Sequence, residues 1–188
     1  MKKVLFCFLC ASVIGAGKLK AQVAGIKGGV SLTNVSNING DDRVTGHVGL
    51  FLHQPLSKNF CIQPEILYAP MGEKFTGLTG SKSTLALSYI QVPVMFQYYP
   101  VKQFYVELGP QVSFLTDAKV KADGGNKVNV KDNYTAADFN INFGIGINAT
   151  RNLGFYGRYN LGVTDITKND NTTYSNRGFQ LGAAVRLK

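Results

Sequence analysis

The chain has 188 residues, a formal net charge of +9 and a mean hydropathy near zero. This length favours one domain with a sizeable core. After residue 21 the Lys and Arg residues form no run interleaved with aromatic residues, which argues against a nucleic-acid-binding protein.

The first 21 residues have the pattern of a secretory signal peptide. Two lysines precede an apolar run over 4–16, and Ala21 offers a small residue for cleavage. That run has 13 residues, fewer than the roughly 18 that a spanning helix needs. We therefore predict a signal peptide over 1–21 and one domain over 22–188. The mature chain would keep 167 residues and, because four lysines leave with the signal, a net charge of +5.

After the signal, apolar and polar residues alternate over long stretches. In 139–149 every odd position is apolar and every even position is Asn or Gly. Strict alternation indicates a strand with one apolar face, and about 9 to 11 residues suit a strand that crosses a bilayer at a tilt. In chain order the alternation predicts eight strands, over 23–33, 44–56, 60–76, 84–99, 104–118, 139–149, 153–164 and 178–187. An even number suits a closed antiparallel barrel.

The links between these strands alternate in length. Short links over 57–59, 100–103 and 151–152 alternate with longer polar links over 34–43, 77–83, 119–134 and 168–176. Outer-membrane barrels alternate short periplasmic turns with longer outer loops. The predicted fold class is therefore all-β, an eight-stranded antiparallel up-and-down transmembrane β-barrel with its short turns in the periplasm.

Five charged residues fall on the polar faces of the predicted strands, namely Lys27, Glu65, Glu107, Arg158 and Arg186. An Arg or Lys at the bilayer midplane costs about 2 to 4 kcal/mol on the lipid face, so these side chains should point into the lumen. The lumen of an eight-stranded barrel is just wide enough for side chains to fill it. We expect the five residues to form a lumen charge network that plugs the barrel. Each carboxylate should pair with one of the three cations, and the sequence leaves the choice open.

Catalytic and metal-binding patterns are weak. Two carboxylates on facing strands resemble a glycosidase acid/base pair, but every small barrel needs internal charges. His47 and His53 lie about 20 Å apart along an extended strand, too far to share one metal ion. No Gly-x-Ser-x-Gly motif and no ordered calcium loop occur. Cys61 is the only cysteine after the signal, so no internal disulfide is expected. We predict no catalytic residue, no cofactor and no metal.

Three prolines conflict locally with the strand pattern. Pro64, Pro93 and Pro110 lie inside predicted strands, where proline removes a hydrogen-bond donor from the ladder. A closed barrel has no free edge at which the loss is harmless. We therefore expect β-bulges or local gaps in pairing at these positions.

Five segments, in their order and spacing, resemble the PorT-like outer-membrane β-barrel domain found widely in Bacteroidetes proteins. They are GIKGGVSL at 25–32, QPEILY at 63–68, YIQVPV at 89–94, LGP at 108–110 and RYNLGVTDI at 158–166. The resemblance implies an integral barrel inserted by the outer-membrane assembly machinery. Some relatives serve protein secretion, and no catalytic motif transfers to this chain. One departure is the C-terminus, which ends in Leu187 and Lys188, whereas many such barrels end in an aromatic residue.

The sequence thus predicts a non-enzymatic barrel in the outer membrane of a Gram-negative bacterium, with a plugged polar lumen. Its role would be structural or accessory, in the cell envelope or in protein secretion, through outer loops or partner contacts. Expected partners are outer-membrane lipids and lipopolysaccharide, the assembly machinery, and envelope or secretion proteins. Three alternatives remain open: a narrow pore for small solutes, a soluble lipocalin-like barrel with inverted faces, and a lipid-modifying barrel enzyme.

Overall fold

The computed structural model describes residues 22–36, 41–76, 82–122, 127–166 and 174–187. The predicted signal peptide over 1–21 lies outside the described residues. Within them the chain forms strands and one short 3-10 helix, η1 (Lys131–Asn133). The strands are β1 (Val23–Val35), β2 (Asp41–Pro55), β3 (Phe60–Thr76), β4 (Lys82–Tyr98), β5 (Phe104–Ala122), β6 (Lys127–Asn129), β7 (Ala137–Asn148), β8 (Leu153–Gly162) and β9 (Asn176–Arg186).

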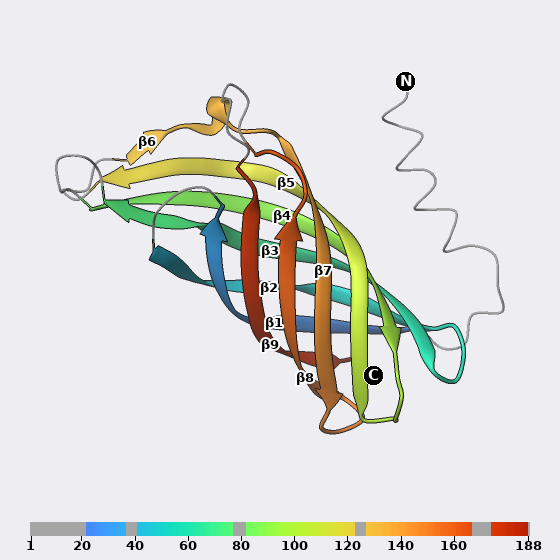
Figure 1. The fold of residues 1–188 in the computed structure, drawn as a ribbon. Coiled ribbons are helices and arrows are strands. Elements are labelled where there is room, and N and C mark those ends of the chain that lie inside the picture. The colour runs from blue at the N-terminus through green and yellow to red at the C-terminus, as the bar shows by residue number, and fades with distance from the viewer. Residues whose placement is uncertain (1–21, 37–40, 77–81, 123–126, 167–173, 188) are drawn as a thin grey trace, which may run out of the picture.

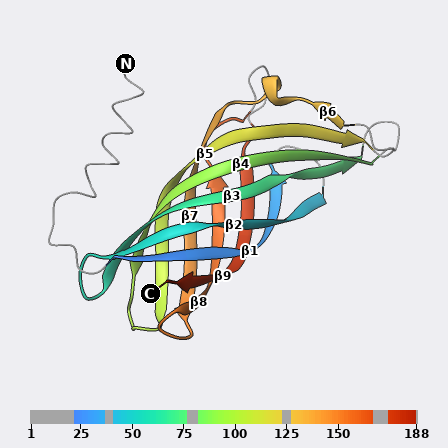
Figure 2. The ribbon, with the colours of Figure 1, turned by 180° about the vertical axis from the view of Figure 1, so that it is seen from behind.

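Eight of the described strands close into an antiparallel barrel (Figures 1 and 2). Neighbours in sequence pair around the wall, with β7 following β5, and β1 closes the ring by pairing with β9. The three short turns and the end of β9 gather at one end of the barrel, which we call the short-turn end. At the opposite end, the long-loop end, β3, β4 and β5 extend past β1 and β7 to β9. The predicted eight-stranded antiparallel up-and-down barrel is confirmed.

Each predicted strand range overlaps one strand of the barrel wall. The largest difference is in β5, which runs four residues past the predicted end at 118, to Ala122. Its extension is paired on both sides, with β4 and with the short β6. Neither β6 nor η1 was predicted, because three residues are too few to show alternation. Both lie in the link over 119–134, for which the sequence predicts a loop.

The three prolines interrupt the ladder as expected. Pro64 coincides with a two-pair gap between β2 and β3, Pro93 with one between β3 and β4, and Pro110 with one between β4 and β5. The register is the same on both sides of each gap. Each proline lacks a backbone N–H donor, and the wall accommodates this by leaving two residue pairs unpaired without a change of register. Two register shifts occur elsewhere, between Asp42 and Val48 and between Ser88 and Tyr89.

The apolar face of each strand points outward, as the alternation predicts. Large apolar side chains exposed on the outer wall include Ile26, Val30, Leu32, Val48, Leu50, Ile66, Tyr68, Phe96, Val106, Leu108, Phe143, Ile145, Phe155, Tyr159, Phe179 and Leu181. The opposite faces fill the lumen with polar and charged residues. Among the described residues, no helix is long and apolar enough to cross a bilayer. The soluble lipocalin-like alternative requires the reverse arrangement, so the structure argues against it.

Candidate functional site: the lumen charge network

Four charged side chains meet in the lumen at the level where β1, β3, β5 and β8 face one another. The Arg158 guanidinium donates through Nη1 and Nη2 to the two Glu65 oxygens, each at 2.9 Å. Its Nε donates to Glu107 Oε1 at 2.8 Å. Lys27 Nζ donates to the Glu65 oxygens at 3.0 and 3.1 Å. Each side chain is no more than 2% exposed, so the network is sealed from solvent.

A glycine makes the contact between Arg158 and Glu107 possible. Glu107 on β5 pairs with Gly144 on β7, and Gly144 pairs with Arg158 on β8. Glu107 and Arg158 therefore lie on strands separated by β7, at the same level of the barrel. A Cβ on Gly144 would lie 2.7 Å from Glu107 Oε1. The missing side chain leaves the space through which Arg158 and Glu107 touch.

Neutral side chains donate further hydrogen bonds to both carboxylates. Gln63 Nε2 donates to Glu65 at 2.9 Å, and Gln97 Nε2 donates to Glu107 at 3.0 Å. The Lys27 ammonium lies 3.9 Å from the centroid of the Tyr156 ring. Two cations and two carboxylates cancel in formal charge. Because a buried charge costs several kcal/mol unless it is paired and hydrogen-bonded, this balance lets the charges occupy a water-poor lumen.

Arg186 does not join this network, so the prediction that it belongs to the lumen charge network is wrong. On β9, Gln180 is the residue opposite Arg158, and Arg186 stands six residues further along. That offset is about 20 Å in an extended strand. Arg186 instead donates to Asn148 Oδ1 at 3.1 Å and to the Arg151 carbonyl at 3.4 Å, at the short-turn end.

The two histidines are separate, as expected. His47 Nδ1 lies 2.8 Å from Ser31 Oγ, and its Nε2 lies 2.6 Å from the Tyr156 hydroxyl. His53 lies 3.2 Å from Cys61 Sγ, on the side of the short turns. Within the described residues, no three His, Cys, Asp or Glu side chains are grouped to hold a metal ion. Both histidines act as hydrogen-bonding residues of the lumen wall.

A second polar layer lies beyond the charge network toward the long-loop end. Gln111 Nε2 donates to Asn140 Oδ1 at 3.1 Å, and Asn142 Nδ2 donates to Gln111 Oε1 at 2.9 Å. Asp138 accepts from Thr164 at 2.8 Å and from Asn176 at 2.9 Å. All but Thr164 are buried. Asn140 and Asn142, polar residues of the segment 139–149, therefore form hydrogen bonds with other side chains inside the lumen.

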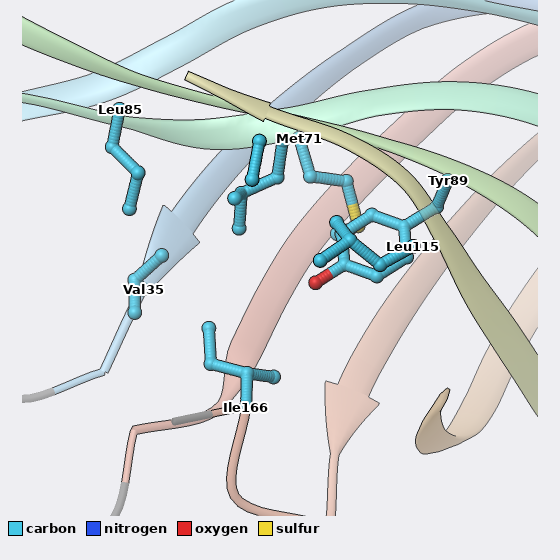
Figure 3. Packing of buried hydrophobic residues seen from close by; sticks show 8 residues of the cluster. Val35, Met71, Leu85, Tyr89, Leu115 and Ile166 are labelled. Atoms are coloured by element: carbon cyan, nitrogen blue, oxygen red, sulfur yellow. The ribbon is translucent and has the colours of Figure 1, made fainter. Parts of the chain in front are cut away.

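An apolar layer, which was not predicted, lies inside the barrel near the long-loop end. It comprises Val35, Met71, Leu85, Leu87, Tyr89, Leu115, Ala118 and Ile166, all buried. Figure 3 shows Val35, Met71, Leu85, Tyr89, Leu115 and Ile166 pointing toward one another from different strands and from the segment after β8. The signal in the sequence was Leu85-Ala86-Leu87, three apolar residues in a row that break the alternation of β4. The sequence prediction assumed polar residues inside the barrel and apolar residues outside, so it could not identify an apolar layer in the lumen.

Comparison with known proteins agrees with the geometry. Residues 21–168 match the family described as outer membrane protein beta-barrel domain. The chain belongs to this family. Membership makes the protein a small barrel of the outer membrane, and it does not distinguish the PorT-like subgroup. A comparison with curated protein sequences gives no significant match.

Solved structures share the barrel fold at low sequence identity. Neisserial surface protein A matches with a TM-score of 0.56 and 11% identity, covering 91% of this chain and 100% of the other. Ail, the attachment invasion locus protein of Yersinia pestis, was solved with the heparin analogue sucrose octasulfate. It matches with a TM-score of 0.50 and 13% identity, covering 89% of this chain and 100% of the other. At such identities the likeness concerns the fold alone.

Proposed function

We propose that this outer-membrane barrel is non-enzymatic and conducts no solute, and that it acts through its outer loops and envelope partners. The observation that carries the proposal is the double closure of the lumen. The charge network fills one level with side chains no more than 2% exposed. The apolar layer fills another level nearer the long loops. A solute would have to displace both.

The catalytic alternative has little support from the geometry. Both lumen carboxylates are held by Arg158 and are sealed from solvent, whereas an acid/base pair must reach a substrate and a water molecule. The pore alternative requires a continuous aqueous path past the two filled levels. We therefore favour an accessory role in envelope organisation or protein secretion, as in some PorT-like relatives. Lipopolysaccharide, the assembly machinery and envelope proteins are the proposed partners, and cleavage after Ala21 the proposed processing.

Single-channel recording in planar bilayers tests the closed lumen. The purified barrel should give no conductance steps, and an unboiled-versus-boiled gel shift of the same sample would verify that the barrel is folded. Steady, reproducible steps from folded protein would refute the plugged lumen and favour the narrow pore. A lipid-hydrolysis assay on the same preparation addresses the enzyme alternative, and turnover above that of the same protein after heat denaturation would overturn the non-enzymatic proposal.

A further inference from the structure

Charge is divided unevenly between the two ends of the barrel. Among the described residues, the carboxylates outside the lumen network lie toward the long-loop end: Asp41, Asp42, Glu73, Asp117, Asp132, Asp138 and Asp165. The long-loop end also carries cations, whereas the charged side chains described at the short-turn end are all cations. Each of its three turns contributes one, Lys58, Lys102 and Arg151, and the last residue of β9 contributes Arg186. Within the described residues this end has four cations and no carboxylate.

Three of these cations line one cavity at the short-turn end. The cavity has a volume of about 250 Å³, and Lys58, Lys102 and Arg186 form its wall together with Ser57, Asn148 and His53. The lining residues come from β2, the start of β3, β9, the β2–β3 and β4–β5 turns and the end of β7. Figure 1 shows these segments converging at the same end. We call this cavity the basic mouth.

The positive charges of the basic mouth are not neutralised within the described part of the chain. Arg186 donates to the side-chain oxygen of Asn148 and to the carbonyl of Arg151, both uncharged acceptors. These two bonds orient the guanidinium without cancelling its charge. No ion pair among the described residues involves Lys58, Lys102 or Arg186. Burial raises the pKa of Tyr99, another lining residue, to about 12, so its phenol stays uncharged.

Size and donor chemistry indicate what would fit. The basic mouth is smaller than the roughly 300 to 1,000 Å³ of pockets for drug-sized molecules, so it suits a small group. Guanidinium and ammonium groups donate their strongest hydrogen bonds to carboxylate and phosphate oxygens. A bound anion would also relieve the mutual repulsion of the three cations.

We propose that the basic mouth is a binding site for an oxyanion, a phosphate or a carboxylate, presented from the periplasmic side. The orientation follows the rule that short turns of outer-membrane barrels face the periplasm. The oxyanion belongs either to a soluble periplasmic solute or to a phospholipid headgroup of the inner leaflet. The site is at the opposite end from the outer loops and does not depend on whether the lumen conducts.

Calorimetric titration of the folded barrel in zwitterionic detergent at low ionic strength tests the site. The probes are citrate and inorganic phosphate. One saturable site is expected, and Lys102→Gln and Arg186→Gln should each weaken it about tenfold, as the loss of one charge-assisted hydrogen bond does. Lys121→Gln, an exposed lysine at the long-loop end of β5, removes the same charge elsewhere and should leave the affinity unchanged. The gel shift verifies that each variant is folded.

Two results would overturn the proposal: no saturable binding of either probe, or an equal loss of affinity in Lys121→Gln, which would reduce the effect to net charge. Repeating the titration in nanodiscs separates the two sources of the oxyanion. Weaker citrate binding in discs with phosphatidylglycerol than in discs of phosphatidylcholine alone assigns the site to a lipid phosphate. Equal binding in both assigns it to a soluble anion.

Discussion

Replacing Gly144 by alanine tests whether the space at this position holds the charge network together. The new Cβ would stand 2.7 Å from Glu107 Oε1, 2.9 Å from Glu107 Cγ and 2.9 Å from the Gly157 carbonyl oxygen. Contacts this short force Glu107 to move, and its bond to Arg158 Nε, now 2.8 Å, must lengthen or break. One added methyl group should therefore disrupt an ion pair that spans two strand spacings.

The size of the effect follows from what remains bonded. Breaking a buried ion pair by removing one partner costs about 3 to 5 kcal/mol. Here Arg158 keeps both bonds to Glu65, and Glu107 keeps its bond from Gln97. We therefore expect a loss at the lower end, about 3 kcal/mol in the free energy of unfolding. Reversible urea unfolding in lipid vesicles, extrapolated linearly to water, measures it.

A matched control and a double-mutant cycle make this prediction refutable. Gly46→Ala makes the same change in another strand, where the nearest atom to the new Cβ is 3.6 Å away, and should change stability by less than about 1 kcal/mol. In a Glu107→Ala background, Gly144→Ala should cost clearly less, because the main clash is gone. If Gly144→Ala is as mild as Gly46→Ala, or if its cost is the same in both backgrounds, the proposed role of the glycine is wrong.

Three further predictions concern the charge network, the apolar layer and the N-terminus. Glu65→Gln leaves two buried cations to share one carboxylate, and urea unfolding should show a loss of about 3 to 5 kcal/mol; a change below 1 kcal/mol would mean that the charges are solvated. Leu87→Ala opens a cavity in the apolar layer and should cost about 2 to 5 kcal/mol in the same assay, whereas Leu50→Ala on the exposed outer wall is the control, and equal costs would contradict the layer's role. Intact-mass spectrometry of the protein extracted from outer membranes should give a chain that starts at Gln22, and a mass that includes residues 1–21 would refute the signal peptide.

The sequence by itself determined the faces and the number of barrel strands. Side chains alternate with a period of two, so one correct position in a strand assigns all its other positions to lipid or lumen, as far as the next β-bulge. This is why Lys27, Glu65, Glu107 and Arg158 could be placed inside from the pattern alone. Because a charged side chain facing lipid costs free energy, the face that carries the charges was assigned to the lumen. The gaps at the prolines could also be predicted from the sequence, because a proline lacks the backbone N–H at its own position.

Only the tertiary structure decided which lumen residues meet. Alternation gives the face of a residue but not its level along the barrel axis, which depends on the register between strands far apart in sequence. Arg158 therefore reaches Glu107 across Gly144, whereas Arg186, on the same type of face, stands about 20 Å away along its strand. The apolar layer, too, depends on which residues of distant strands lie at the same level. Leu85 and Leu87 point inward near the long-loop end, and at that level apolar contacts, not charges, fill the interior.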